Sequence, residues 1–356
     1  MASGMNVAVI CAANPSNSGM YSVDLAARQF FQSRGIPFQL FVTQIKGRQV
    51  KRMGELEFHL LKSLQKARGF SHIVYWGDFL NNPEYGRTDF AARDIMFQTS
   101  PDLEAAKARW LELFAPDKDE RPLLSIGNNF QHDALDPDPL FAEATDRIQR
   151  NFRIILPRDA LSVSNLSRSF RAANLHKIQP GMDCAFLLKG EPAEERGPFF
   201  SYYFGRSGFK DQKRLVRRLE EVTGLQGREV SRWLRLEKEG LHGHFQDRRQ
   251  QLACSQFVVT DVYHLSVNTL NMRTPVLCLG RPSQAQQGTL GDMKKRFLFQ
   301  MLGLGEFYVE SQRANYVDIH AFLERIADPR DFDERLAIKD ALTLRFQRDI
   351  ETALAA

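Results

Sequence analysis

The sequence predicts an α/β protein of two domains, each built on a mainly parallel sheet that helices cover. Short apolar runs rich in Val, Ile, Leu and Phe alternate with longer segments of helical period. The 356 residues suffice for two domains of the usual size, about 150 residues each. Residues 189–198, KGEPAEERGP, interrupt the alternation with the composition of an exposed linker.

The composition is that of an ordinary globular protein, with 43 % hydrophobic and 26 % charged residues, which excludes a disordered or fibrous chain. The net charge of +5 does not by itself indicate nucleic acid, and none is expected as a partner. The segment from Lys210 to Arg249 contains eleven Lys or Arg and seven Asp or Glu, so it carries +4 of the net charge of +5. We therefore expect a basic face in the second domain and, through it, a peripheral contact with the inner membrane surface.

The cysteines and the apolar runs indicate a cytoplasmic protein. The four cysteines are far apart and form no C-x-x-C motif, so buried, reduced thiols are expected at Cys11, Cys184, Cys254 and Cys278. The opening MASGMNVAVICAAN has no basic region typical of a signal peptide, and no run reaches the ~20 apolar residues of a membrane span.

The first domain is expected over residues 1–190. Its strands are expected at residues 6–13, 38–45, 72–76, 123–126, 153–156 and 184–188. Helices are expected at 23–33, 103–114, 141–150 and 163–173, and Ser100-Pro101 is typical of a helix start. Leu56, Leu60, Leu61 and Leu64 have the spacing of one helical face, which predicts a further helix there.

The second domain is expected over residues 199–330. Its strands are expected at 199–204, 229–234, 256–260 and 275–279, and its helices at 212–222, 264–271, 290–302 and 317–326. Residues 331–356 have helical period and are expected to form a C-terminal helix that docks back on the first domain. Two parallel sheets of this kind would bind a ligand in a cleft at the carboxyl ends of their strands.

Polar loops follow three strands of the first domain and are candidates for holding an anion or a sugar. Because the carboxyl ends of parallel strands share one edge of a sheet, these loops are expected to open on the same side. A polar turn without a ligand is the alternative for each loop. The candidate residues are Asn14, Asn17, Ser18 and Gly19 after the first strand, Gly77 and Asp78 after the third, and Asn128 and Asn129 after the fourth.

Two further segments could carry charge or move a proton. Arg158-Asp159, with Ser162 three residues on, could bind a phosphate or simply tie a strand to the next helix. Asp261 and His264 end an apolar strand at the start of a helix and are the candidate catalytic residues, since His could transfer a proton near neutral pH. Lys294 and Lys295 begin a later helix, where either could reach a phosphate or face solvent, and no metal-ligand cluster is visible.

Taken in order, these segments resemble the polysaccharide pyruvyl transferase family. The similar pieces are the Asn14 to Gly19 loop, Arg158-Asp159 with Ser162, the segment GMDCAFLL with Asp183, and VVTD with His264. The resemblance covers most of the chain, and the series is more specific than any single piece.

The resemblance implies two Rossmann-like domains in a GT-B-like arrangement with a cleft between them. It also implies transfer of an enolpyruvyl unit from phosphoenolpyruvate, the donor substrate, onto two hydroxyls of a bacterial surface-glycan sugar to give a pyruvate ketal. No cofactor is implied, the acceptor could be lipid-linked, and His264 would be the proton-transfer residue.

One departure changes the expected donor site. Val262 stands where similar proteins commonly have Arg, so Arg206, Lys294 or Lys295 is expected to supply the missing cation beside Arg158. Two alternatives stay open: a glycosyltransferase that uses a nucleotide-activated sugar, and a non-catalytic module that binds glycan or a membrane surface on the same fold. The acceptor sugar and the oligomeric state do not follow from the sequence.

Overall fold

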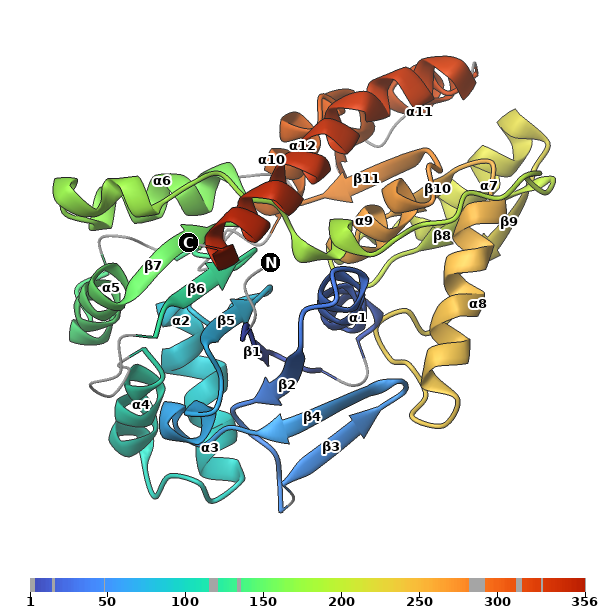
Figure 1. Ribbon diagram of the computed structural model, residues 1–356. Coiled ribbons are helices and arrows are strands. Elements are labelled where there is room, and N and C mark those ends of the chain that lie inside the picture. Colours follow the sequence, from blue (N-terminus) through green and yellow to red (C-terminus); the bar gives the residue numbers. More distant parts are fainter. Residues whose placement is uncertain are drawn as a thin grey trace. The chain divides into compact units, whose positions relative to one another are not determined.

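The computed structural model describes residues 4–14, 17–47, 49–114, 121–132, 136–281, 292–311, 316–327 and 329–355 (Figure 1). The chain divides into two compact units. Unit 1 consists of Met1–Ala13, Val23–Leu187 and Arg345–Ala356, and unit 2 of Asn14–Ser22 and Leu188–Leu344. The segment after the first strand thus belongs to unit 2, although the strand itself belongs to unit 1.

Unit 1 contains a seven-stranded sheet in the order β3-β4-β2-β1-β5-β6-β7. All neighbours pair in parallel except β3 and β4, which form an antiparallel hairpin. Every side chain of the central strand β1 is buried because helices cover both faces of the sheet. The strands are β1 (Val7–Cys11), β2 (Phe38–Val42), β3 (Val50–Met53), β4 (Leu56–Leu60), β5 (His72–Trp76), β6 (Leu123–Ile126) and β7 (Phe152–Leu156).

Side-chain caps and prolines start several helices of unit 1. Asp138 accepts a hydrogen bond from the Leu140 N–H at 2.9 Å, and Pro139 takes the first helical position, where its missing N–H costs nothing. The helical elements are α1 (Ser18–Ser33), η1 (Leu64–Ala67), α2 (Pro83–Tyr85), η2 (Gly86–Phe90), α3 (Ala91–Met96), α4 (Leu103–Glu112), α5 (Pro139–Asn151), α6 (Ala160–Ser169), η3 (Ala172–Lys177) and η4 (Cys184–Leu187).

The helix expected from Leu56 to Leu64 is wrong. Residues 50–60 form the hairpin of β3 and β4, whose turn contains Gly54 with a φ of +56°. In β4 the side chains of Leu56, Phe58 and Leu60 are buried and the two between them are not, which is the alternation of a strand. The spacing of the leucines fits both a helix and a strand, and the turn at the glycine favours the hairpin.

Two other expectations for unit 1 are also wrong. Cys184–Leu187 is buried throughout, as expected of a strand, but it forms the 3₁₀ helix η4 because the Asp183 carboxylate accepts the Ala185 N–H and turns the chain. Helix α4 begins after Asp102, which accepts the Ala105 N–H at 2.8 Å, and not at Ser100. The Ser100 hydroxyl instead donates to the buried Asp94 carboxylate.

Unit 2 contains a five-stranded, wholly parallel sheet in the order β12-β11-β10-β8-β9. Its strands are β8 (Phe199–Tyr203), β9 (Gln226–Glu229), β10 (Val258–Thr260), β11 (Val276–Gly280) and β12 (Tyr308–Glu310). Its helical elements are α7 (Gln212–Thr223), α8 (Leu241–Cys254), α9 (Tyr263–Asn271), α10 (Met293–Met301), η6 (Gly305–Phe307), α11 (Tyr316–Arg325) and α12 (Pro329–Ala355), the last of which continues into unit 1.

The second strand of unit 2 lies earlier than expected. Gly224 ends α7 in the left-handed conformation, and β9 starts two residues later, so the strand covers residues 226–229 instead of 229–234. Val230 and Trp233 are buried beyond the strand and give that stretch its apolar pattern.

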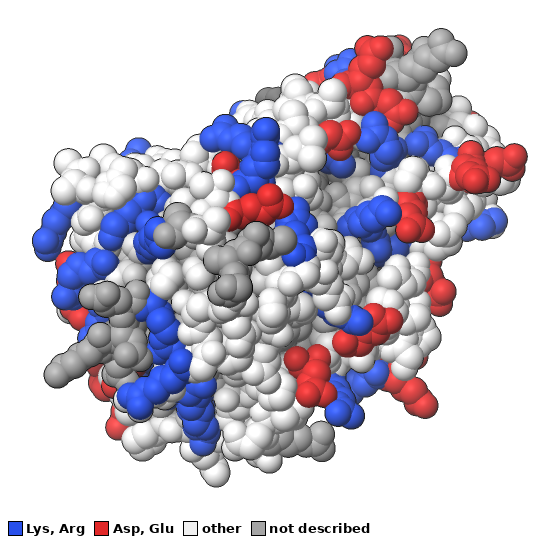
Figure 2. All heavy atoms as spheres, in the orientation of Figure 1, with Lys and Arg blue, Asp and Glu red and all other residues white. Residues whose placement is uncertain are grey.

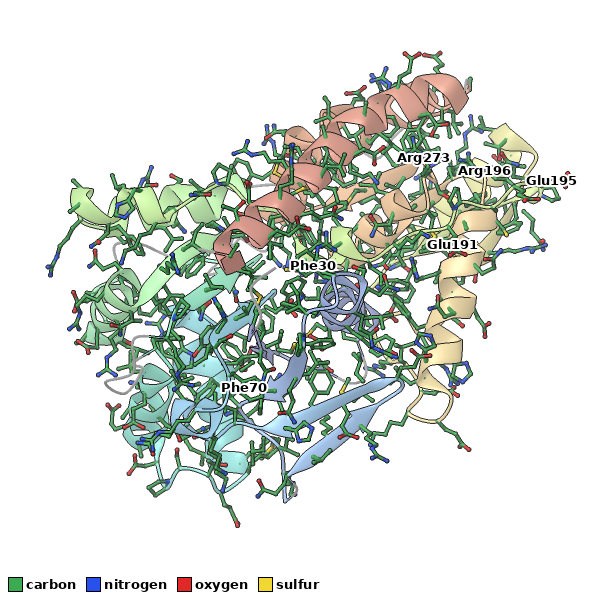
Figure 3. All side chains as sticks on the ribbon, in the orientation of Figure 1. Phe30, Phe70, Glu191, Glu195, Arg196 and Arg273 are labelled. Atoms are coloured by element: carbon green, nitrogen blue, oxygen red, sulfur yellow. The ribbon has the colours of Figure 1, made fainter. Side chains whose placement is uncertain are left out.

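The segment expected as an exposed linker is anchored on unit 2. Arg196 donates to the carbonyl oxygen of Arg273 at 3.0 Å, and the two side chains lie near each other in Figure 3. Gly197 donates to the Cys254 carbonyl at 2.7 Å, and Gly190 lies so close to the Asn271 carbonyl that a Cβ would not fit.

The prediction of an α/β protein with two Rossmann-like, mainly parallel sheets is confirmed. Within the described residues, every helix is too short or too polar to span a bilayer.

Candidate active site

The order of strands marks one place in each sheet where a ligand is expected. In unit 1 the chain proceeds outward from β1 in both directions, so the order reverses between β1 and β5. In unit 2 it reverses between β8 and β10. Ligands of open α/β sheets bind at the carboxyl ends of the strands at such a reversal. Asp261 and His264 follow β10, and Gly77 and Asp78 follow β5, so both expected sets occupy these places.

Asp261 holds the loop that follows β8. Its carboxylate accepts hydrogen bonds from the backbone N–H groups of Gly205, Arg206 and Ser207 at 2.7, 3.0 and 2.6 Å. The Ser207 hydroxyl donates to it at 2.7 Å. The carboxylate is fully buried and its hydrogen-bonding capacity is used by this loop. Asp261 therefore positions the loop, and its expected catalytic role stays a prediction.

His264 lies in the first turn of α9 and packs against Gly19. A Cβ built on Gly19 would lie 2.5 Å from the His264 Cβ and 2.7 Å from its Nδ1, so only glycine allows this approach. The imidazole is half-buried, and the Tyr263 ring meets it edge-on at 5.1 Å. The positive end of the α9 dipole lies at this turn, and the residue before it, Val262, makes no side-chain capping hydrogen bond.

The start of α1 is held in place for this contact. The Asn17 side-chain oxygen accepts the Gly19 N–H at 3.0 Å, and the Ser18 N–H donates to the Trp233 carbonyl at 3.1 Å. One turn further, the Asn268 amide donates both to the Ser22 hydroxyl and to the His264 carbonyl. The loop and the histidine, which lie about 245 residues apart in the sequence, are thus brought together. Asn14 closes the loop with its carbonyl, which accepts the Asn17 N–H at 3.4 Å.

The two expected lysines have different surroundings. The Lys294 ammonium lies 5.5 Å from the centre of the Tyr263 ring, the ring that also contacts His264. Lys295 is buried, and its ammonium binds the Asp292 carboxylate at 2.9 Å and the Leu279 carbonyl at 3.1 Å. Lys294 is consequently the lysine placed beside the candidate histidine, whereas Lys295 holds α10 to the sheet.

Arg281, which the sequence analysis did not single out, reinforces the same loop. Its guanidinium donates to the carbonyls of Arg206 at 2.6 Å and Ser207 at 3.2 Å. Arg281 is the residue directly after β11, and that position was the signal that could have identified it. The side chains of Arg206 and Arg281 are both exposed, so two guanidinium groups lie at this edge of the sheet.

In unit 1, left-handed residues turn the chain after β5. Gly77 and Asp78 have φ values of +69° and +55°, and a Cβ on Gly77 would collide with Val23. The Asp78 carbonyl accepts the Asn129 N–H at 2.5 Å, and the Asn128 amide donates to the Tyr75 carbonyl at 2.9 Å. The expected loops after β5 and β6 therefore do lie together at one edge of the sheet.

Arg158 is buried in a network of carboxylates. Its guanidinium lies 3.4 Å from Asp159 and 3.6 Å from Asp183, and only 2 % of its surface is exposed. Asp159 also caps α6 through the Ser162 N–H and accepts from the Gln131 amide. The Arg158-Asp159 segment thus ties the ends of β6 and β7 to η4. In unit 1, Arg158 neutralises buried carboxylates and does not face solvent.

Asp24 is a buried acid that the sequence analysis missed. It lies in the second turn of α1, between Val23 and Leu25, and is fully buried. Neither carboxylate oxygen has a described N–H or O–H partner, and the Cys11 thiol lies beside it. Burial and then the charge of Asp78 raise the pKa of Asp24 well above its usual range. The sequence feature that could have identified Asp24 is an acidic residue in an otherwise apolar helical stretch.

The expected residues thus form two clusters, one in each unit. Unit 2 holds the segment Asn14 to Gly19 with Asp261, His264, Arg206, Lys294 and Lys295, and unit 1 holds Gly77, Asp78, Asn128, Asn129, Arg158 and Asp183. Within the described parts of the chain, no three His, Cys, Asp or Glu side chains are grouped as metal ligands. Cys11, Cys184 and Cys278 are buried free thiols, and Cys254 is half-buried.

Comparison with known proteins shows the fold. No family model and no curated protein sequence matches the chain. Among solved structures, a Listeria monocytogenes protein assigned as a UDP-N-acetylglucosamine 2-epimerase has 9 % identity and a TM-score of 0.52, over 94 % of this chain and 91 % of that one. Another UDP-N-acetylglucosamine 2-epimerase has 11 % identity and a TM-score of 0.50, over 93 % and 90 % of the two chains. The chain shares the fold of these enzymes, two Rossmann-like domains, over nearly its whole length.

Proposed function

We propose that this protein is a transferase of glycan metabolism that binds the phosphate of an activated donor at the start of α9. His264 transfers the proton in the reaction, and Lys294 balances the donor's charge. The observation that carries the proposal is the contact between His264 and Gly19, at the reversal of strand order in unit 2.

The surroundings of His264 suit an anionic group. The N-terminus of α9 favours negative charge, and the Lys294 ammonium lies over the neighbouring Tyr263 ring. Val262, which stands where similar proteins have Arg, is buried and cannot take that role. Lys294 is the better substitute, because its ammonium lies over the Tyr263 ring that contacts His264, whereas the Lys295 ammonium is buried against Asp292.

One donor that fits is phosphoenolpyruvate, which the order of the sequence motifs supports. His264, as imidazolium, would protonate the methylene carbon of the donor and leave an oxocarbenium-like centre. A sugar hydroxyl attacks that centre and loses its proton to the now neutral imidazole. The C–O bond to phosphate breaks, and a second hydroxyl closes the ketal ring and passes its proton to the departing phosphate, so that one phosphate leaves for each ketal formed.

The second donor is a nucleotide sugar, which the fold comparison supports better than the first. The two solved structures of similar fold bear the name of enzymes that act on UDP-N-acetylglucosamine. In that case the same helix start would bind the diphosphate, and His264 would take the proton of the attacking acceptor hydroxyl.

A thermal-unfolding titration with phosphoenolpyruvate, UDP-glucose and UDP-N-acetylglucosamine tests the proposal. A donor at about 100 times its dissociation constant adds roughly 2.7 kcal/mol to the free energy of unfolding. We expect a saturable rise in Tm with one donor class, reduced in Lys294→Met but not in Arg52→Met, a surface control in unit 1. No rise with any donor, in the presence or absence of acceptor sugars, would contradict the proposal.

A further inference from the structure

A basic segment lies outside the candidate active site, in the first half of α7 and the loop before it. From Lys210 to Arg218 the chain has five Lys or Arg and one acidic residue, Asp211, a local charge of +4. The net charge of the whole protein is +5. On the face shown in Figure 2, by contrast, basic and acidic side chains are mixed. Helix α7 is the pale yellow helix beside β8 and β9 in Figure 1.

The helix presents these cations to solvent on one side. Leu215 and Leu219 are buried on the inner side of α7. Lys213 and Arg217 are four residues apart and lie one above the other on the outer side, with Arg214 beside them, and Lys210 lies in the loop just before the helix. All four that define this basic face are exposed: Lys210, Lys213, Arg214 and Arg217.

Internal ion pairs do not compensate this basic face. Among the described residues, no carboxylate forms an ion pair with any of its four cations, whereas the adjacent Arg218 binds Glu221 at 3.2 Å. Like charges four residues apart repel each other by a few tenths of a kcal/mol. Lys213 and Arg214 also lie in the first turn of α7, where the helix dipole disfavours cations. The basic face therefore lowers stability, and an anionic partner would relieve that repulsion.

We propose that the basic face of α7 docks on an anionic phospholipid surface. Clusters of four or more Lys or Arg on an amphipathic helix bind anionic headgroups, each adding about 1 kcal/mol. Lys213 and Arg217 are four residues apart, about 6 Å along α7, and Lys210 lies in the loop just before the helix, so the cations can meet neighbouring headgroups together. The exposed large apolar side chains of the described residues lie elsewhere, so contact is electrostatic and without insertion.

Vesicle sedimentation tests this inference, which does not depend on the donor. Vesicles of phosphatidylcholine with roughly one-third phosphatidylglycerol are compared with phosphatidylcholine alone. The full-length protein is compared with the triple variant Lys213→Gln, Arg214→Gln, Arg217→Gln. The control is Lys62→Gln, Lys66→Gln, Arg68→Gln, which removes the same charge from exposed residues of unit 1.

We expect binding only to the vesicles with phosphatidylglycerol, and a loss of about 100-fold in affinity in the α7 variant with little change in the control. Binding of the unaltered protein should also fall steeply between about 50 and 300 mM salt. Equal losses in both variants, or binding that ignores salt or phosphatidylglycerol, would overturn the inference. So would preferential binding of an oligonucleotide through the same three residues with no vesicle binding.

Discussion

Gly19 and His264 are packed so closely that the smallest possible side chain at Gly19 would collide with the imidazole. A Cβ there would lie 2.5 Å from the Cβ of His264, a distance that real Cβ atoms do not reach. The Asn268 amide donates to both the Ser22 hydroxyl and the His264 carbonyl, and so links the segment that carries Gly19 to the first turn of α9. The contact explains why the polar loop after β1 carries a glycine at this point.

Gly19→Ala should therefore displace His264 and lower turnover at least 10-fold, because small displacements of a reacting group are costly. Overpacking should also lower the free energy of unfolding by about 1–3 kcal/mol. Steady-state kinetics and urea unfolding measure the two effects. Gly243→Ala is the matched control, since nothing lies within 4 Å of a Cβ there and α8 should gain up to about 1 kcal/mol. Normal turnover in Gly19→Ala would show that this contact does not position the histidine.

Asp261→Asn should destabilise unit 2, because four donors converge on the carboxylate and the amide replaces one acceptor oxygen with a donor. Breaking such a buried charged network typically costs about 3–5 kcal/mol. Urea unfolding measures the loss, with the exposed Asp211→Asn as the control. A variant that keeps its stability but loses all turnover would instead favour a catalytic role for Asp261.

The two neighbouring lysines should respond differently to the same substitution. Lys294→Met keeps the side-chain length but removes the charge, and it should weaken donor binding about 10-fold with little effect on stability, as for one charge-assisted contact. Lys295→Met removes the 2.9 Å ion-pair partner of the buried Asp292 carboxylate, which then keeps only its contacts with Arg281 among the described residues, and should lower the free energy of unfolding by about 3 kcal/mol. Calorimetric titration measures the loss of donor affinity, and urea unfolding measures the loss of stability. If Lys295→Met weakened donor binding and Lys294→Met lowered stability, the placement of the donor beside Lys294 would be contradicted.

Asp24 should make stability depend on pH. Its pKa is raised in the folded state, so above its unfolded pKa the unfolded chain has lost a proton that the folded chain retains. The contribution of Asp24 is therefore complete at low pH and is lost as pH rises toward its folded pKa. Asp24→Asn should remove this loss. The free energy of unfolding of the variant minus that of the unaltered protein should therefore be larger at pH 8 than at pH 5. Urea unfolding of both proteins at both pH values measures this difference. The same difference at pH 5 and pH 8 would contradict the prediction.

The sequence predicted the parallel strands and the placement of His264 because both depend on local patterns. Apolar runs identified β1, β5 and β10, and the residues after them were necessarily at the ligand-binding edge. Where two periods fit the same residues, as from Leu56 to Leu64, the pattern could not decide between helix and hairpin. The hairpin depends on a left-handed glycine, whose conformation the pattern of apolar residues does not reveal.

The sequence could not predict roles that depend on partners far along the chain. Arg158 has the chemistry of a phosphate ligand, yet its burial between Asp159 and Asp183 gives it a structural role within unit 1. Asp261 looked like a catalytic acid, and only the backbone of residues 205–207 shows what its carboxylate does. Asp24 and Arg281 escaped notice because their significance lies in neighbours far along the chain.

The rate of donor consumption in His264→Ala tests the central claim most directly. The measurement follows phosphate or nucleotide release with the donor that raises Tm, and the exposed His176→Ala is the matched control. We predict a fall of about 10²- to 10⁴-fold in turnover with His264→Ala, with the fold and donor affinity retained and the control unaffected. Unchanged turnover in His264→Ala would contradict the claim that this histidine transfers the proton.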